Sequence, residues 1–249
     1  MSNHEAFIFT PITTVLEEAV SASYVINDGV ETYPLSEYII HSLFLKMTGF
    51  QEQKMKCIAW EMATYDYGYR RSLLQNEDKL GEYSSYKAKS AIYKRLNELI
   101  KSLKASYDVN YLTKQQWIDE SVEEIKKIFS NSVLVTWTQR KYDYFVHGFK
   151  IGEEQILPSD TKMFKNKAQL SASVEVVLEL QYEELYNNRN RLAHNTLSYQ
   201  ENLPSLKSLQ KEDDTSRNYF IWFFILVLID RIFMEIFKVY LKELEENDF

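Results

Sequence analysis

The sequence predicts an all-α protein, a multi-helix bundle, and three observations support this. Glycine and proline number only 6 and 4 in 249 residues, against about 17 and 12 at average usage. β-Sandwiches and barrels need these residues at their turns, so the shortage favours long helices. Apolar residues recur at helical spacing along most of the chain. The composition, 45% hydrophobic and 26% charged, is that of a globular chain that buries its own core.

The length fits one large domain or two small ones. No linker forces a boundary. We predict a helical lobe over residues 1–110, which need not fold independently, and a second helical domain over residues 111–249.

Apolar spacing predicts four helices in the first part of the chain, over residues 12–24, 34–48, 51–76 and 85–105. Pro34 can open the second of these helices and Gly49 is expected to break it. Gly68 is a soft spot in the third helix, and Ser84 or Ser85 can cap the fourth.

The second part of the chain is predicted to contain a helix from Thr113 and a long helix over residues 170–194. Residues 133–146 are β-branched and aromatic, which fits a helix or a short strand pair; we favour the helix. Residues 148–158 are expected to form a loop and residues 196–215 a polar connector. Residues 218–246 are predicted to form a strongly apolar closing helix.

The closing helix invites comparison with a membrane span. Tyr219–Ile229 is a stretch of eleven residues without a charge, and Asp230 and Arg231 follow it. A spanning helix needs about 20 apolar residues, and an Asp-Arg pair in lipid is costly. We therefore expect a core or dimer-interface helix and no membrane insertion.

Charge and cysteine content exclude several classes of protein. The net charge of −7 opposes wrapping of duplex DNA but permits a local basic cleft. The single Cys57 excludes an intramolecular disulfide and a cysteine-based zinc site, and we expect a small buried thiol. No signal peptide is visible, so a cytoplasmic location is expected.

Several enzyme motifs are absent, among them the phosphate loop, the dinucleotide-binding turn, the nucleophile elbow and the zinc helix. Of the four histidines, His4 is expected to lie at a fraying terminus. His41 is expected to be partly buried, and His147 to lie near a helix C-terminus. His194 remains as the candidate for chemistry.

His194 lies in an unusually polar block at positions 187–195. Seven of these nine residues are polar or charged, and they interrupt an amphipathic helix. Asparagine opposes helix propensity by a few tenths of a kcal/mol at each position, roughly. Sequences that break local rules in this way often do so at functional sites.

Within this block, Arg189-Asn190-x-x-x-His194 resembles the R-N-x-x-x-H form of the R-x4–6-H motif of the HEPN superfamily. These are small all-helical domains that include many metal-independent endoribonucleases. The resemblance covers the motif, the helical composition and the position before a final apolar helix. It implies a HEPN-like core in the C-terminal part of the chain and cleavage without metal or cofactor. It also implies a homodimer with the two motifs facing each other, in a bacterial toxin or antiviral-defence system with an antitoxin or other partner.

Two features qualify the resemblance. Arg140 and His147 also have a permitted spacing, but Tyr142, Tyr144, Phe145 and Val146 between them look like core, whereas the family's preferred polar residue, Asn190, directly follows Arg189. Arg189 and His194 are therefore preferred. In addition, Thr196 stands where the toxin branch paired with nucleotidyltransferase antitoxins has a modified tyrosine, so that form of regulation is doubtful.

The chemistry of these residue types fits RNA cleavage. A base must take the 2′-OH proton, an acid must protonate the leaving oxygen, and a cation must stabilise the phosphorane. Imidazole and guanidinium supply these functions. We predict Arg189, Asn190 and His194 as catalytic residues, and Arg191 and Asn195 as accessory RNA contacts. On one helix, Arg189 and His194 point about 140° apart, so a second copy is a sensible way to complete the site.

A basic helix face over residues 87–104 is a candidate RNA-tracking surface. It offers Lys87, Lys94 and Arg95, with Tyr86 and Tyr93 as rings that bases could stack on. The alternative is a solvated helix face whose tyrosines belong to the core.

Two other functions remain open from the sequence. One is a non-catalytic interaction protein that binds a partner through its apolar closing helix, and the other is a membrane-associated effector anchored by that helix.

Overall fold

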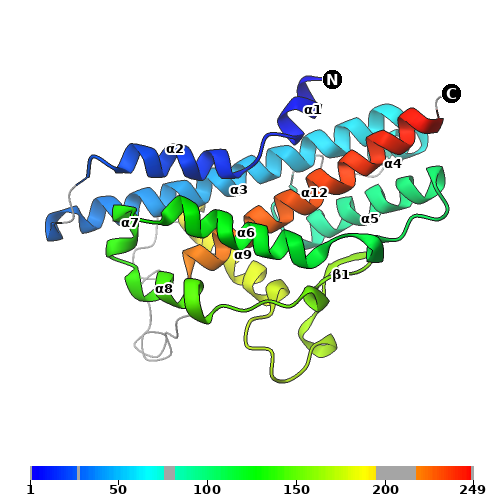
Figure 1. Cartoon of the computed structure of the whole chain (residues 1–249). Helices are drawn as coiled ribbons and strands as arrows, with labels where there is room; N and C mark the ends of the chain where they lie inside the picture. The colour runs from blue at the N-terminus through cyan, green and yellow to red at the C-terminus, as the bar shows by residue number, and fades with distance from the viewer. Residues whose placement is uncertain (1, 27–28, 76–81, 195–216, 248–249) are drawn as a thin grey trace.

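The computed structural model describes residues 2–26, 29–75, 82–194 and 217–247. Over these residues the protein is a bundle of helices with one small hairpin (Figure 1), which confirms the predicted all-α class. The helices are α1 (Asn3–Ile8), α2 (Thr13–Ser23), α3 (Tyr33–Tyr65), α4 (Tyr67–Gln75), α5 (Tyr86–Leu103), α6 (Lys114–Phe129), α7 (Val133–Thr136), α8 (Gln139–Asp143), α9 (Leu178–His194) and α12 (Tyr219–Asn247). The two strands are β1 (Ile156–Ser159) and β2 (Lys162–Phe164).

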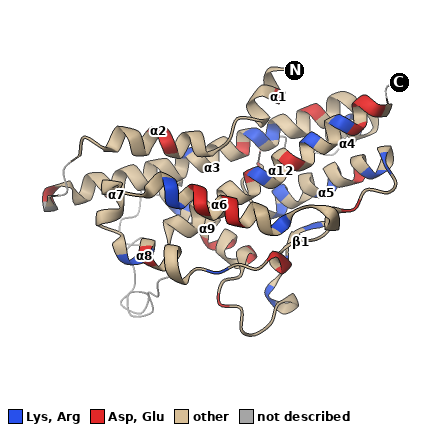
Figure 2. Ribbon diagram, in the orientation of Figure 1, with Lys and Arg blue, Asp and Glu red and all other residues tan. Residues whose placement is uncertain are grey.

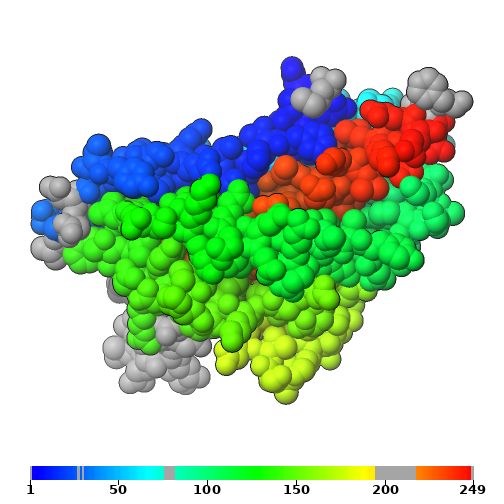
Figure 3. Space-filling view, viewed as in Figure 1, coloured from blue at the N-terminus to red at the C-terminus, as the bar shows by residue number. Residues whose placement is uncertain are grey.

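Helix α12 forms the centre of the bundle. It contacts α3, α5, α6 and α9, and its stretch from Phe220 to Ile229 is at most 3% exposed. In Figure 3 its C-terminal half reaches the surface, while α6 covers its first part. Of the two expectations for this helix, the core helix is confirmed.

One hydrophobic cluster runs from Ile8 to Tyr240 and includes residues from both predicted lobes. The first part of the chain contributes α3 and α5 to the surroundings of α12, and the second part contributes α6 and α9. The division at residue 110 therefore stays a prediction about autonomous folding.

Helix α3 is continuous over 33 residues, so the expected break at Gly49 is wrong. A single glycine costs a helix about 1 kcal/mol. Fully buried side chains on both sides of it, among them Met47 and Met55, outweigh that cost because the hydrophobic effect favours a continuous packed face. The helix ends at Asp66, whose Oδ1 accepts a 2.5 Å hydrogen bond from the backbone N–H of Tyr69 in α4.

Gly49→Ala is expected to stabilise the protein by about 0.5–1 kcal/mol, because alanine lowers the conformational entropy of the unfolded chain. A Cβ at position 49 meets nothing within 4 Å. Gly148→Ala is the matched control and should destabilise, since its Cβ would lie 2.8 Å from Cδ2 of Tyr144. Urea unfolding of both variants measures the difference. A loss of stability in Gly49→Ala would contradict an unstrained helix with room for a methyl group at this position.

Local start signals are confirmed at two helices. The Ser85 hydroxyl accepts a 3.2 Å hydrogen bond from the backbone N–H of Ala88 at the start of α5. Helix α6 begins directly after Thr113. Residues 133–146 form α7, α8 and the first part of a π turn over Tyr144–Gly148, so the helical alternative is also confirmed.

Two predictions around α9 are wrong. The expected loop over residues 148–158 includes β1, which pairs antiparallel with β2. Residues 170–177 are not helical, because the buried side chain of Gln155 binds this segment. Its Nε2 donates to the carbonyl oxygen of Val176 (3.0 Å), and its Oε1 accepts from the N–H of Leu178 (3.2 Å). Helix α9 therefore begins at Leu178.

A buried ion pair fastens the N-terminal helices to the bundle. Lys54 Nζ of α3 lies 2.6 Å from Asp230 Oδ1 of α12, with side chains 0% and 3% exposed. Lys54 also donates to the carbonyl oxygen of Thr10 (2.7 Å), and Asp230 Oδ2 accepts from the N–H of Ile12 (3.0 Å). Burial raises the pKa of Asp230 and lowers the pKa of Lys54. The pair thus holds the α1–α2 link against α3 and α12.

Within the described ranges, no helix combines the length and the hydropathy that a membrane crossing requires. Charged residues of both signs are mixed over the helices in the view of Figure 2.

Candidate functional site

The predicted motif lies on the last turns of α9, which contacts α3, α5 and α12. Arg189, Asn190 and Arg191 are all half-buried there. His194 is the last residue of the helix. The His194 side chain, Asn195 and Thr196 lie outside the part of the chain that the structure describes.

The Arg189 guanidinium is held by groups from two helices. Its Nη1 donates to Oδ1 of Asn190 (3.1 Å), and its Nη2 lies 3.5 Å from Oε2 of Glu52 in α3. Glu52 also pairs with Lys56 at 3.2 Å. The Arg189 side chain keeps 23% of its surface exposed. It is therefore oriented by its neighbours and still open to solvent, which suits a cation that must meet a substrate phosphate.

Asn190 contacts Arg189 through its side-chain oxygen. The sequence suggested that Asn190 orients the histidine ring or binds phosphate. The observed hydrogen bond gives it another use, because it fixes one arm of the guanidinium fork.

A buried lysine lies close enough to Arg189 to be affected by its charge. Lys89 of α5 is 1% exposed, and its Nζ donates to the carbonyl oxygen of Tyr83 (2.6 Å) and lies 5.7 Å from the ring centroid of Tyr182. Burial lowers the pKa of Lys89 to about 7; the charge of Glu52 raises this pKa and that of Arg189 lowers it. Neither Glu52 nor Lys89 was predicted from the sequence as part of this site. Glu52 looks like any solvent-facing helix residue, and Lys89 looks like one more residue of the basic face.

Lys89 should make the protein more stable as the pH rises from about 7 toward 9.5. Its pKa is about 7 in the fold and about 10.4 in an unfolded chain, so the unfolded state binds more protons in this window and stability rises with pH. The slope from this group is at most about 1.4 kcal/mol per pH unit.

Urea unfolding between pH 6.5 and 9.5 tests this expectation. Lys89→Met should flatten the rise, while Lys87→Met, an exposed lysine on the same helix, should follow wild type. Parallel curves for wild type and Lys89→Met would show that Lys89 does not titrate in this window.

Arg191 joins a separate polar group around α12. Its Nη2 donates to Oδ1 of Asn188, whose Nδ2 donates to the hydroxyl of Tyr219 (3.2 Å). The ring of His41 lies 5.5 Å from that of Tyr219. Burial lowers the pKa of His41; the charge of Glu37 opposes this and that of Arg191 adds to it. His41 is half-buried, as expected. Arg189 and Arg191 thus have different partners: Arg189 contacts Asn190 and Glu52, and Arg191 contacts Asn188.

The structure places the residues of the predicted RNA-tracking face on α5. Tyr93 is fully buried and donates to the carbonyl oxygen of Ser159 (2.8 Å), while Tyr86 stacks on Phe164 with ring centroids 5.6 Å apart. The alternative of core tyrosines is therefore right for Tyr93, because its ring has no surface left for a base.

The basic residues of this face differ in whether they form ion pairs within the chain. Lys94 pairs with Glu98 at 3.7 Å. Arg95 lies 3.6 Å from Asp66 and 3.4 Å from Glu98. Lys87 is exposed and lines a pocket beside α9. The structure thus places Lys87 toward the α9 side of the molecule and binds Lys94 and Arg95 to acidic residues of the chain itself.

His4 and Cys57 both belong to the structure of the first helices. The expected fraying of His4 is wrong, because α1 is capped by Ser2 and His4 Nδ1 lies 3.2 Å from Glu61 Oε1. Cys57 is half-buried, and burial raises the pKa of its thiol. A raised pKa lowers the fraction of thiolate, so this cysteine is a poor nucleophile.

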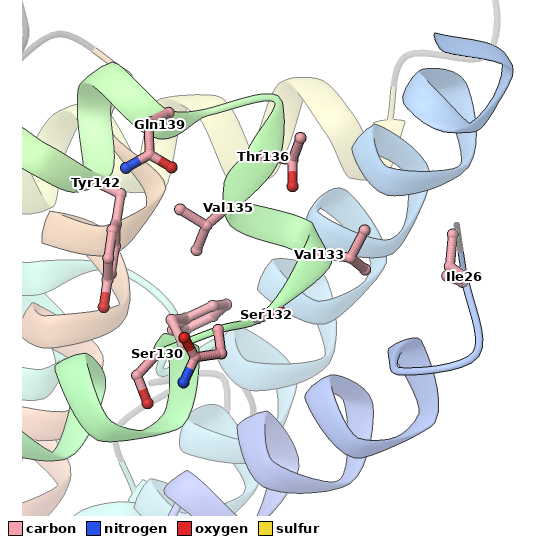
Figure 4. A pocket seen from close by; sticks show the side chains of 10 residues that line it. Ile26, Ser130, Ser132, Val133, Val135, Thr136, Gln139 and Tyr142 are labelled. Carbon is pink, nitrogen blue, oxygen red and sulfur yellow. The ribbon is translucent and has the colours of Figure 1, made fainter. Parts of the chain in front are cut away.

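A cavity of about 720 Å3 opens between the end of α2 and the α6–α8 segment (Figure 4). Its lining includes Ile26, Val133, Gln139 and Tyr142. Among the described residues that line it, Tyr142 is the one titratable group, and burial raises the pKa of that phenol.

Among the described residues, no three His, Cys, Asp or Glu side chains gather where they could ligate a metal ion. No protein-family model, no curated protein and no solved structure matches the chain.

Proposed function

We propose that this protein is a metal-independent endoribonuclease of the HEPN type that acts as a homodimer. The observation that carries the proposal is the Arg189-Asn190-x-x-x-His194 block on α9, in which the arginine is both oriented and open to solvent. Arg189, Asn190 and His194 are its proposed site residues.

The proposed reaction is an internal transesterification. His194 takes the proton of a ribose 2′-OH, whose oxygen attacks the adjacent phosphorus. The bond from phosphorus to the 5′-oxygen breaks, and the imidazolium of the second copy's motif protonates that oxygen. The products are a 2′,3′-cyclic phosphate and a 5′-OH. Arg189 donates to the phosphorane oxygens, where its charge is most effective as negative charge develops.

Arg191, Asn195 and Lys87 are proposed as accessory RNA contacts. Lys94 and Arg95 are proposed with them, although both already form ion pairs within the chain. The mixture of acidic and basic residues along the helices (Figure 2) and the net charge of −7 favour few phosphate contacts and short single-stranded sites. A role as a bacterial antiviral-defence effector or toxin, located in the cytoplasm with an antitoxin or defence partner, rests on the resemblance alone.

The structure gives little support to a non-catalytic interaction protein that uses Tyr219–Ile229. This stretch is covered by its own chain, apart from the half-buried Tyr219, so it presents no broad apolar face to a partner.

The chemistry of the product ends tests the proposal. Wild-type protein is incubated with single-stranded RNA in EDTA, and we expect fragments with 2′,3′-cyclic phosphate and 5′-OH ends. DNA of the same sequence should stay intact because it lacks the 2′-OH. Fragments with 5′-phosphate ends, or cleavage of the DNA, would contradict a 2′-OH mechanism.

A further inference from the structure

A second cavity, of about 500 Å3, lies beside α9 and is walled by α5, β2 and α9. Its volume is within the range of small-molecule sites, roughly 300–1,000 Å3. The lining residues that matter here are Tyr86, Lys87, Lys162, Glu179, Tyr182 and Tyr186.

The aromatic walls of this pocket are largely fixed. The Tyr86 hydroxyl accepts from the N–H of Phe164 (2.8 Å), and the Tyr182 hydroxyl donates to the carbonyl oxygen of Ser84 (2.8 Å). Tyr186 differs from both, because its side chain is only half-buried and keeps part of its surface exposed. A rigid aromatic recess with one accessible ring suits a flat aromatic ligand.

The charges on the α9 wall of the pocket oppose an anionic group there. Glu179 and Glu183 lie one turn apart on the α9 wall, and burial together with the Glu183 charge raises the pKa of Glu179. Lys87 and Lys162 are exposed on the other walls. A phosphate is repelled by the two carboxylates, whereas a neutral ring with N–H donors is attracted to them.

The pocket opens on the same side of α9 as the proposed catalytic arginine. Tyr182, Tyr186 and Arg189 are spaced i, i+4 and i+7, so they share one face of the helix. Tyr186 precedes Arg189 by about 4.5 Å of helix rise. A nucleotide held at Tyr186 therefore has its backbone next to Arg189.

We propose that this pocket takes one nucleobase of the RNA, stacked on Tyr186, with its exocyclic amine donating to the Glu179 carboxylate. The site prefers adenine, cytosine and guanine to uracil, because uracil has no exocyclic amine. Lys87 and Lys162 meet the flanking phosphates. This inference deepens the proposed ribonuclease function and rests on it for the identity of the ligand.

Binding of non-cleavable RNA tests the pocket without any need for cleavage. Fluorescently labelled 2′-O-methyl oligonucleotides of A, C or U are titrated with intact protein and followed by anisotropy. Wild type should bind the A and C oligomers about tenfold more tightly than the U oligomer, since one directed hydrogen bond to a charged group is gained.

Three variants separate stacking from hydrogen bonding. Tyr186→Ala should weaken binding of the A and C oligomers about tenfold or more, while Tyr186→Phe should keep most of the affinity. Glu179→Ala should reduce the preference for A and C over U. Tyr111→Ala is the control, because Tyr111 is 84% exposed and does not line the pocket. Circular dichroism confirms that each variant is folded.

Equal affinity of wild type for all three oligomers, or unchanged binding by Tyr186→Ala, would overturn the pocket. A different result would contradict the ribonuclease proposal and leave the pocket standing: wild type binds these oligomers with the expected preference but does not cleave RNA that has free 2′-OH groups. Cleavage by wild type together with indifference to Tyr186→Ala would overturn the pocket alone.

Discussion

Arg189→Ala is expected to cleave RNA about 100- to 1,000-fold more slowly than wild type, the usual cost of removing one preorganised donor to a developing oxyanion. The reason is the geometry of its guanidinium, which Asn190 and Glu52 orient while part of the side chain stays exposed. Arg189→Lys should recover only part of the rate, because an ammonium keeps the charge but loses the planar fork. Single-turnover cleavage at saturating protein measures the effect on the chemical step.

Arg231→Ala is the matched control for this prediction. Arg231 is similarly exposed, at 27%, and its Nη1 and Nη2 lie 2.6 Å and 3.0 Å from Glu120 and Glu124. It lies on α12 and pairs with acidic residues of α6. Its loss should leave the cleavage rate of folded protein unchanged. Equal rates for Arg189→Ala and Arg231→Ala would remove Arg189 from the proposed site.

Asp230→Asn and Lys54→Met should each lower the free energy of unfolding by about 3–5 kcal/mol. Either substitution leaves a buried charge without its partner, which is among the most costly single changes in a core. The link at Thr10–Ile12 should loosen as well, since both residues bind this pair through their backbone. Urea unfolding followed by circular dichroism measures the loss.

The double variant Lys54→Met/Asp230→Leu should lose much less than the sum of the single variants, because no charge remains buried. Lys46→Met is the surface control. Lys46 and Glu18 form a 3.4 Å pair with both side chains more than half exposed, and such pairs contribute at most about 1 kcal/mol. Additive losses in the double variant would contradict a coupled buried pair.

Local signals were sufficient for the fold class and for several helix starts. The Ser85 hydroxyl acts within one turn of chain, so its effect can be predicted without tertiary structure. The backbone conformation at Gly49 and over residues 170–177 depends instead on contacts with residues distant in sequence. Buried side chains on both sides of Gly49 keep α3 helical there. Gln155 binds the backbone of Val176 and Leu178, so that α9 does not extend further toward its N-terminus.

In the candidate site, too, some residues were predictable from local sequence and others depend on tertiary packing. Arg189 and Asn190 were predicted because the motif is contiguous in sequence. Glu52 and Lys89 could not be predicted, because α3 and α5 bring them to Arg189 only through tertiary packing. The pocket at Tyr186 likewise combines α5, β2 and α9, and β2 itself was not predicted.

The most direct test of the central proposal is single-turnover cleavage of single-stranded RNA in EDTA by wild type and by His194→Ala, with equal folding shown by circular dichroism. We predict that wild type cleaves the RNA and that His194→Ala falls to the rate of the uncatalysed control. Cleavage by His194→Ala at the wild-type rate would show that the imidazole on the last turn of α9 has no part in the reaction.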